Sequence, residues 1–183
     1  MQRRNFYILL FSIIFGNFVI WINVYAFIIL DASLPGDTVT FKGDGIISEV
    51  SISLSDVKSN EYQQVIDKEF SFINSGYNEY TDIYSGASLW SIIQVEVMLL
   101  DDPSYLTFRF YAYDGYSSPS ALNLSLAMTY PEDVIIAYEN DGVPLNAQNG
   151  GPLRSIINRN IIPSLFNSQY AVQQLKFIVI DYA

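Results

Sequence analysis

The side chains available for chemistry in this sequence are carboxylates, tyrosines, lysines and arginines. Its 183 residues include no Cys and no His. The sequence therefore offers no thiolate nucleophile, no disulfide and no Cys or His metal ligand. It also lacks the commonest general base, so Ser-His-Asp catalysis and His-containing metal centres are excluded. Sites made of carboxylate, Tyr, Lys or Arg side chains remain open.

Acidic residues dominate the chain after residue 30. All 19 Asp and Glu residues lie there, against seven Lys and Arg residues, which gives this part a formal charge of −12. A domain with this charge repels phosphate backbones, so we do not expect nucleic acid as a partner. A solvated acidic surface explains the composition in the ordinary way and identifies no partner by itself.

An uncharged apolar run at residues 6–30 predicts a membrane anchor. A helix of this length spans about 37 Å, which is enough to cross a hydrocarbon core of about 30 Å. A cleaved signal peptide is the alternative, but its apolar core would be about 7–15 residues long and would end at small residues. No A-x-A pattern follows this run, so we expect an uncleaved transmembrane helix.

The charges on either side of this run predict its orientation. Arg3 and Arg4 precede it and Asp31 follows it. Positive residues stay on the cytoplasmic side of a membrane. We therefore expect a single-pass protein of the cell membrane, with residues 1–5 in the cytoplasm. Residues 31–37 would be a tether, and residues 38–183 would be one domain outside the cytoplasm.

The sequence after the tether predicts a mostly-β α+β domain. Period-two or continuous apolar patterns predict strands at residues 38–42, 46–54, 65–74, 106–113, 134–138, 153–157 and 175–181. Phe70 and Phe72 should share one face of their strand. The stretches 43–45 and 114–115 have the Gly and Asp residues typical of turns.

Helices are expected to be few and short. Ser88 is the expected N-cap of a helix at 89–97. The buried side of that helix should carry Leu89, Ile92 and Ile93. Ser55 is expected to cap a helical turn that runs toward Ser59, and Gly86 is expected to end a loop.

Four segments of this region carry a family resemblance through the order of their strands and turns. They are YSGASLWSII (84–93), YAYDGYSSPSALNLSLAM (111–128), PEDVIIAYENDGVPLNAQNGGPLR (131–154) and VQQLKFIVID (172–181). The third is the most specific, because its spacing and residue types match one known family pattern over about 20 positions. Through these segments the chain resembles the oxidoreductase molybdopterin-binding domain family of sulfite oxidase type. The resemblance implies a mainly-β domain that holds a pterin-linked molybdenum ion and moves oxygen atoms or electrons.

The chain departs from the family pattern at the metal. Family enzymes bind molybdenum through one Cys on a strand-to-loop turn in the first half of the domain, and Asn74 stands in that place here. A neutral amide cannot act toward molybdenum as a thiolate does. Asn149 stands where the family often has His. Outside the anchor the chain has three arginines for anion contacts, Arg109, Arg154 and Arg159. We therefore expect no metal ligand and no catalytic residue, and molybdopterin is implied only by the resemblance.

The resemblance assigns cofactor binding to two loops. Their residues are Asp114, Gly115, Tyr116, Asn149, Gly150, Gly151 and Arg154. Each loop can also be explained by the fold alone. The first would be a tight turn in which the Asp satisfies backbone N–H groups, and the second a loop that needs positive φ. Arg154 could contact a ligand, or it could pair with a carboxylate inside the fold.

Three functions are compatible with these observations. The first is a module that kept the fold, lost the metal and binds a pterin-like or other small ligand or an extracytoplasmic protein. The second is an active molybdenum oxidoreductase with an atypical metal attachment. The third is a structural envelope protein without a ligand pocket. Resemblance of fold cannot separate them, because one fold hosts many functions. We favour the first, because the loops are kept while the thiolate is missing.

Overall fold

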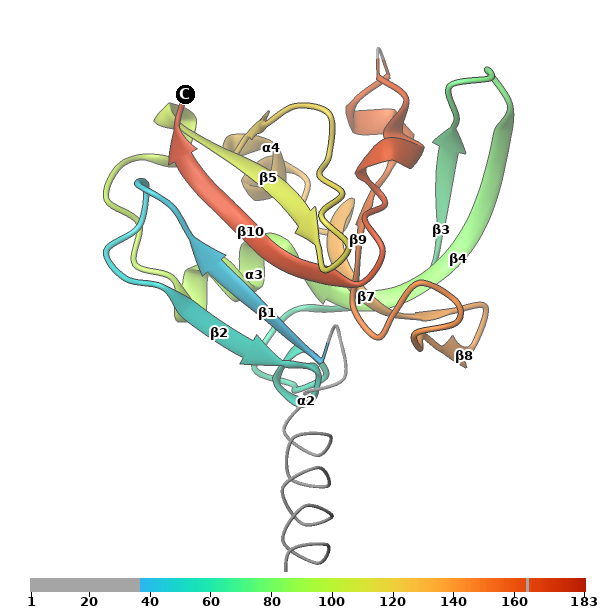
Figure 1. The fold of residues 1–183 in the computed structure, drawn as a ribbon, viewed down its shortest axis with the longest axis horizontal. Helices are drawn as coiled ribbons and strands as arrows, with labels where there is room; N and C mark the ends of the chain where they lie inside the picture. The colour runs from blue at the N-terminus through green and yellow to red at the C-terminus, as the bar shows by residue number, and fades with distance from the viewer. Residues whose placement is uncertain (1–36, 164) are drawn as a thin grey trace, which may run out of the picture. The chain divides into compact units, whose positions relative to one another are not determined.

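Two β-sheets organise residues 37–163 and 165–183, which are the residues that this structure, a computed structural model, describes (Figure 1). The first sheet has the strand order β2-β1-β10-β5-β6. Its strands are β1 (Thr38–Lys42), β2 (Val50–Ser53), β5 (Leu106–Ala112), β6 (Leu122–Asn123) and β10 (Leu175–Tyr182). Strands β1 and β10 are parallel, and the other neighbours are antiparallel.

The second sheet is antiparallel and contains the longest strands. Its order is β3-β4-β7-β8, and β9 also pairs with β7. The strands are β3 (Gln64–Ile73), β4 (Glu79–Ser88), β7 (Val134–Asn140), β8 (Val143–Pro144) and β9 (Arg154–Ile157). Strands β3 and β4 form a long hairpin that projects at the right of Figure 1.

Short helices connect these strands. They are α2 (Leu54–Val57), α3 (Leu89–Glu96), α4 (Ser125–Thr129), and the 3-10 turns η1 (Pro103–Tyr105), η2 (Arg159–Ile161) and η3 (Asn167–Tyr170). Helix α3 buries Leu89, Ile92 and Ile93, as the sequence predicts. Its N-cap is Ser88, whose side chain accepts a hydrogen bond from the Ser91 backbone N–H.

The second sheet is buried on both faces near β7. One face packs with the first sheet and α3 into the main core, to which Val134 and Ile136 belong. The other face contributes to a smaller core that contains Phe70, Phe72 and Ile135. A strand covered on both sides needs apolar residues at successive positions. This explains the continuous apolar run that the sequence shows at 134–137.

Most predicted strands are confirmed within one or two residues, and Phe70 and Phe72 lie buried in the same core cluster. The strand expected at 46–54 is wrong at its start, because only Val50–Ser53 belong to β2. The following helix begins at Leu54. Its cap is Ser53 rather than Ser55, since Ser53 and Asp56 exchange the two hydrogen bonds of a capping box.

The loop expected before Ser88 is also wrong, because Glu79–Ser88 form β4. The first half of β4 lies in the projecting hairpin and is mostly exposed, so its sequence is polar. Gly86 lies inside the strand, where a Cβ would come 2.5 Å from the Ile136 carbonyl oxygen on β7. The glycine therefore marks a close approach of two backbones and not the end of a loop.

The expected membrane helix at 6–30 lies outside the residues that the structure describes. Among those it does describe, no helix combines the length and apolar character needed to span a membrane.

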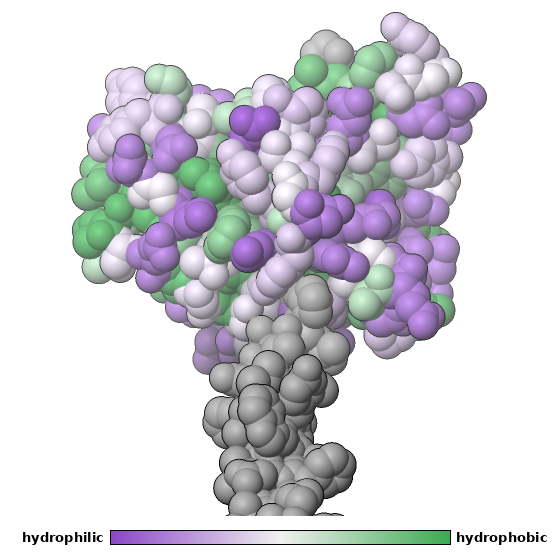
Figure 2. Space-filling model, viewed as in Figure 1, coloured by the Kyte–Doolittle hydropathy of each residue, from purple (hydrophilic) through white to green (hydrophobic). Residues whose placement is uncertain are grey.

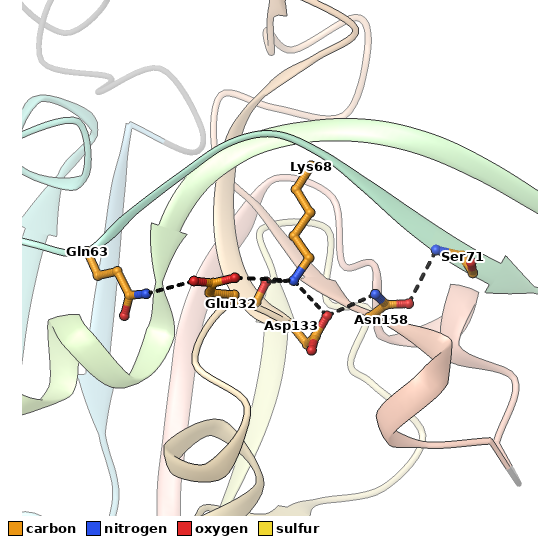
Figure 3. Close-up of polar contacts among 6 residues, drawn as sticks. All are labelled: Gln63, Lys68, Ser71, Glu132, Asp133 and Asn158. Atoms are coloured by element: carbon orange, nitrogen blue, oxygen red, sulfur yellow. Dashed lines mark hydrogen bonds and ion pairs between the residues drawn. The ribbon is translucent and has the colours of Figure 1, made fainter.

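The open edge of β3 is held by polar side chains (Figure 3). The Lys68 Nζ lies 2.9 Å from Asp133 Oδ1. Asn158 donates to the same Asp133 oxygen at 2.9 Å and accepts from the Ser71 backbone N–H at 3.3 Å. A strand edge presents unpaired N–H and C=O groups, and Asn158 satisfies one of them at Ser71, while Lys68 and Asp133 hold the Asn158 side chain and β3 in place.

A second amide, Asn167, continues this edge and is fully buried. Its Oδ1 accepts from the Ile73 backbone N–H at 2.8 Å. Its Nδ2 donates to the carbonyl oxygens of Ser71 and Ile157, both at 2.8 Å. One side chain thereby joins β3 to the end of β9 and to η3.

We predict that Asn167→Ala lowers the free energy of unfolding by about 2–4 kcal/mol, because three backbone groups lose a buried partner. Urea denaturation of the full chain measures the change. Asn160→Ala is the matched control, since Asn160 is exposed and should change stability by about 0.5 kcal/mol or less. Equal stability of the two variants would contradict this role for Asn167.

Candidate functional site

Two of the predicted site regions meet at one cavity of about 240 Å³. Its walls come from the end of β5 and the turn after it, from the start of β9, and from η3 and the segment before β10. The lining residues are Ala112, Asp114, Tyr116, Arg154, Ser168, Ala171 and Gln173. Three of the seven predicted site residues, Asp114, Tyr116 and Arg154, therefore lie together. We call this cavity the Arg154 pocket.

The turn after β5 forms one wall of the Arg154 pocket, and hydrogen bonds fix its conformation. Asp114 Oδ1 accepts from the Tyr116 backbone N–H at 2.9 Å, and Gly115 adopts φ +89°. The Tyr116 hydroxyl donates to the Gln169 carbonyl oxygen at 2.9 Å, which fixes η3 against the turn. Burial raises the pKa of Tyr116, so its hydroxyl stays protonated and able to donate.

The loop 149–151 lies behind the pocket, and none of its residues lines the cavity. Asn149 Oδ1 accepts from the Asn146 backbone N–H at 2.5 Å, within the loop itself. Gly150 adopts φ +90°, and a Cβ there would lie 2.7 Å from Cδ of Gln173. A Cβ at Gly151 would clash with Cβ of Leu145. Gly150 therefore leaves room for the Gln173 side chain in the pocket wall, and Gly151 leaves room for Leu145 within the loop.

Among the described residues that line the pocket, Arg154 is the only cation. Its Nε is buried, and no described residue accepts a hydrogen bond from it. The guanidinium carbon lies 5.7 Å from the centre of the Tyr84 ring. Within residues 37–163 and 165–183, no carboxylate lies within ion-pair distance of this side chain. The internal ion pair considered for Arg154 is therefore not found in the described part of the chain.

The two other arginines of the domain are already engaged. Arg109 donates from Nε to the Ser118 carbonyl oxygen at 2.8 Å and also contacts Ser117 and Pro119. Arg159 forms an ion pair with Glu79 at 2.5 Å. Of the three arginines singled out by the sequence, Arg154 alone has a guanidinium for which the described residues provide no polar partner.

The charge of Arg154 acts on its neighbours on β4. Burial raises the pKa of Tyr84 to about 12, and the positive charge of Arg154 opposes this shift. Burial also raises the pKa of Asp82, as does the nearby charge of Asp141, while Arg154 lowers it. The guanidinium thus sits in a partly desolvated place, where charge–charge interactions are stronger than in water.

Sequence reasoning missed Ser168 and Gln173 as pocket residues. Gln173 lies in the segment 172–181 that carries part of the resemblance, but nothing in its type or spacing marks it. Ser168 lies in η3, a turn that the sequence does not signal. Both reach the pocket because η3 is tied to β9 and to the turn at Tyr116.

The structure places Asn74 away from the Arg154 pocket, in the turn of the β3–β4 hairpin. Its Oδ1 accepts from the backbone N–H groups of Gly76 and Asn78, at 2.9 and 3.0 Å. This turn ends at Glu79, the first residue of β4. Arg154 instead lies near the Tyr84 ring, five residues further along β4. The Asn74 side chain serves the turn and does not line the pocket.

Larger hollows on the domain surface are less suited to bind a ligand. One of about 450 Å³ lies between the hairpin and η2, and its arginine, Arg159, is already paired with Glu79. Another of about 400 Å³ runs along residues 42–49 and is shallow. The cation in this second hollow is Lys42, whose Nζ lies 3.7 Å from the centre of the Phe177 ring, and the acidic residues Asp44 and Glu49 also line it.

The donor groups of the chain do not fit a molybdenum ion held through protein sulfur. The sequence has no Cys, and in the described residues no group of three or more acidic side chains could hold a metal. The Arg154 pocket provides one cation and also a carboxylate, Asp114. A phosphate-bearing pterin would meet little positive charge there.

Comparisons with known proteins agree with this fold. A family model described as the oxidoreductase molybdopterin binding domain matches residues 49–164. Among solved structures, the chain is similar to the sulfane dehydrogenase SoxCD from Paracoccus pantotrophus, with a TM-score of 0.58 and 11% sequence identity. The match covers 79% of this chain but only 38% of that chain, so it shows the fold of one part of the larger protein. No curated protein matches the sequence.

We predict that the full chain loses stability above about pH 10 and that Tyr84→Phe reduces this loss. The pKa of Tyr84 is raised in the folded state from its ordinary value of 10.0 to about 12. The unfolded chain then releases the phenol proton first, so stability is complete below about pH 10 and falls as the pH rises toward 12. Thermal melts between these pH values measure the loss of stability. Tyr105→Phe is the control, because Tyr105 is exposed. The same pH dependence in all three proteins would contradict the assignment.

Proposed function

The chain belongs to the oxidoreductase molybdopterin-binding domain family, and from this premise we propose that it binds a small anion at Arg154 and has no molybdenum redox activity. The observation that carries the proposal is the arginine in a pocket for which the described residues provide no polar partner. The Arg154 side chain is half-buried, and its Nε is a buried polar atom, which costs free energy when it has no hydrogen bond. A bound anion would be its partner.

The lack of a thiolate supports the second half of the proposal. The chain contains no Cys, and the stretch that matches the family therefore contains none. Sulfur from the protein is the usual soft ligand for such a metal centre, and no described cluster of side chains replaces it. We infer that this member uses the family fold to bind and not to transfer oxygen or electrons.

The pocket limits the ligand to a small molecule with one anionic group. Its volume of about 240 Å³ is below the range of about 300–1,000 Å³ that is usual for drug-sized ligands. A single guanidinium can hold one carboxylate, sulfate or phosphate group through two N–H donors. Asp114, which lines the same pocket, disfavours a second negative charge nearby. A small monocarboxylate or a similar oxyanion fits these limits better than a phosphorylated pterin.

We predict that the full chain binds a small oxyanion and that Arg154→Ala weakens this binding tenfold or more, while changing stability by about 1 kcal/mol or less. Charged hydrogen bonds of this kind contribute about 1.5–3 kcal/mol. Calorimetric titration with acetate, sulfate and phosphate measures the affinity, and thermal melts measure the stability. Arg159→Ala is the control, since it removes the same charge from the surface pair with Glu79.

Three results would overturn this function. Equal affinity in Arg154→Ala and Arg159→Ala would show that general charge and not the pocket holds the anion. Unfolding of Arg154→Ala would make the arginine a structural element. Molybdenum bound one to one in purified full chain, found by elemental analysis and changing its oxidation level, would identify an active oxidoreductase.

We also propose that residues 6–30 anchor the protein in the membrane, with residues 38–183 outside the cytoplasm. The uncharged length of this run and the arginines before it support the proposal. A small extracellular or periplasmic molecule, or another protein in that compartment, would then be the ligand.

Protease treatment of intact cells tests this topology. With a tag after Ala183, we expect the tag to be lost from intact cells, because the domain faces outward. A tag before Met1 should stay protected until the membrane is opened. The opposite pattern would place the domain in the cytoplasm, and recovery of the chain in the soluble fraction would contradict an anchor.

A further inference from the structure

An exposed apolar surface lies at the other end of the first sheet from the Arg154 pocket lining. Its side chains are Ile47, Met98 and Leu100, which are 58%, 62% and 51% exposed. Val95, on the last turns of α3, is 56% exposed and lies close to Met98 in the chain. We call Ile47, Met98 and Leu100 the apolar bridge surface.

A short antiparallel contact explains why these side chains point outward. Ile46 and Leu99 pair across it, and both pack on the main core. The Ile47 backbone N–H donates to the Met98 carbonyl oxygen at 3.0 Å, and that of Leu100 donates to the Gly45 carbonyl oxygen at 2.9 Å. Side chains alternate between faces along extended chain, so the neighbours of Ile46 and Leu99 face solvent.

The exposed side chains of the apolar bridge surface lie together, because they belong to the two segments that the Ile46–Leu99 pairing joins. In Figure 2 hydrophobic residues lie together at the left edge of the domain, over the connections from β1 to β2 and from α3 to β5. Single exposed apolar residues need no explanation, whereas a contiguous group marks an interaction surface. Met and aliphatic residues are also suited to contacts that adapt to a partner.

Acidic side chains border this apolar surface on both connections. Asp44 and Glu49 flank Ile47 in the β1–β2 connection, and Asp101 and Asp102 follow Leu100. No ion pair joins any of these four residues to another described residue. The only cation in the groove along residues 42–49 is Lys42, whose Nζ lies 3.7 Å from the centre of the Phe177 ring. The border is therefore strongly negative.

The charge of this border selects among the possible occupants. A second copy of the chain would bring two acidic borders together if the same surfaces met, and like charges across an interface are costly. A membrane surface with anionic lipids would be repelled for the same reason. A protein segment with Lys or Arg beside apolar side chains matches both features.

We propose that the apolar bridge surface binds a protein segment that presents apolar side chains flanked by Lys or Arg. The apolar side chains would cover Ile47, Met98 and Leu100, and the cations would face Asp44, Glu49, Asp101 and Asp102. Acidic borders of this kind steer a basic partner and speed its association, and the effect weakens with salt. The surface shares no residue with the Arg154 pocket, so the two proposals stand or fall separately.

Binding of short labelled peptides to the full chain in phosphatidylcholine nanodiscs tests the proposal by fluorescence anisotropy. One peptide carries Leu flanked by Lys, a second has Glu in place of Lys, and a third has Ser in place of Leu. We expect only the first to bind well, with at least a threefold loss of affinity between about 50 and about 300 mM salt. Empty nanodiscs give the blank.

Substitutions at the apolar bridge surface test whether the peptide binds there. Ile47→Ser together with Met98→Ser should weaken the first peptide tenfold or more, and Asp44→Asn with Glu49→Gln should weaken it severalfold and reduce the salt effect. Val143→Ser is the control, because Val143 is 54% exposed on β8 and should change nothing. Circular dichroism confirms that each variant is folded.

Four outcomes would overturn the proposal. They are equal binding of the Lys and Glu peptides, equal loss in the Val143→Ser control, no binding of any peptide, and self-association that the Ile47 and Met98 substitutions abolish. The last would make a second copy of the chain the occupant. None of these results bears on anion binding at Arg154.

Discussion

The buried amide of Asn167 is the interaction on which the position of the site depends. It bonds to β3 at Ile73 and Ser71 and to β9 at Ile157, and so takes the place that a neighbouring strand would fill. A buried amide with all these bonds made is rigid, because each broken bond would leave a backbone group without a partner. Residue 167 begins η3, and η3 supplies Ser168 to the pocket whose opposite wall is Arg154 on β9.

The charges around Arg154 decide which ligand the pocket can bind. The chain after residue 30 carries 19 acidic residues, yet the guanidinium in the pocket has no carboxylate within ion-pair distance among the described residues. The other two arginines have ordinary structural roles, since Arg109 binds carbonyl oxygens and Arg159 forms a surface ion pair. Arg154 differs from both, since no described residue provides a polar partner for it, and this is why we propose an anion in the pocket. The chain has the family fold and contains no Cys.

The loops that resemble the family's cofactor loops have local tasks in this chain. Asp114 closes a turn, Tyr116 holds η3, and Gly150 leaves room for Gln173. These contacts give the loop pattern a structural role in this chain, because the same residues build the wall of the cavity or pack behind it. The acid-bordered apolar surface around Met98 uses none of these loops, and it depends instead on the pairing of Ile46 with Leu99. Small-ligand binding and protein binding would then occupy separate parts of one fold.

The sequence by itself determined the features that depend on local periodicity and on residue type. The pattern at 106–113 predicted β5, the apolar run at 134–138 predicted a core strand that became β7, and Ser88 predicted the start of α3. The absence of Cys excluded a thiolate before any fold was known. Only the tertiary structure showed that Glu79–Ser88 are a strand, because half of β4 is exposed on a hairpin and lacks an apolar pattern. Only the tertiary structure showed that Ser168 and Gln173 line the same pocket as Arg154, and that Asn74 lies in a turn. These outcomes rest on contacts between residues far apart in the chain, and no local pattern encodes such contacts.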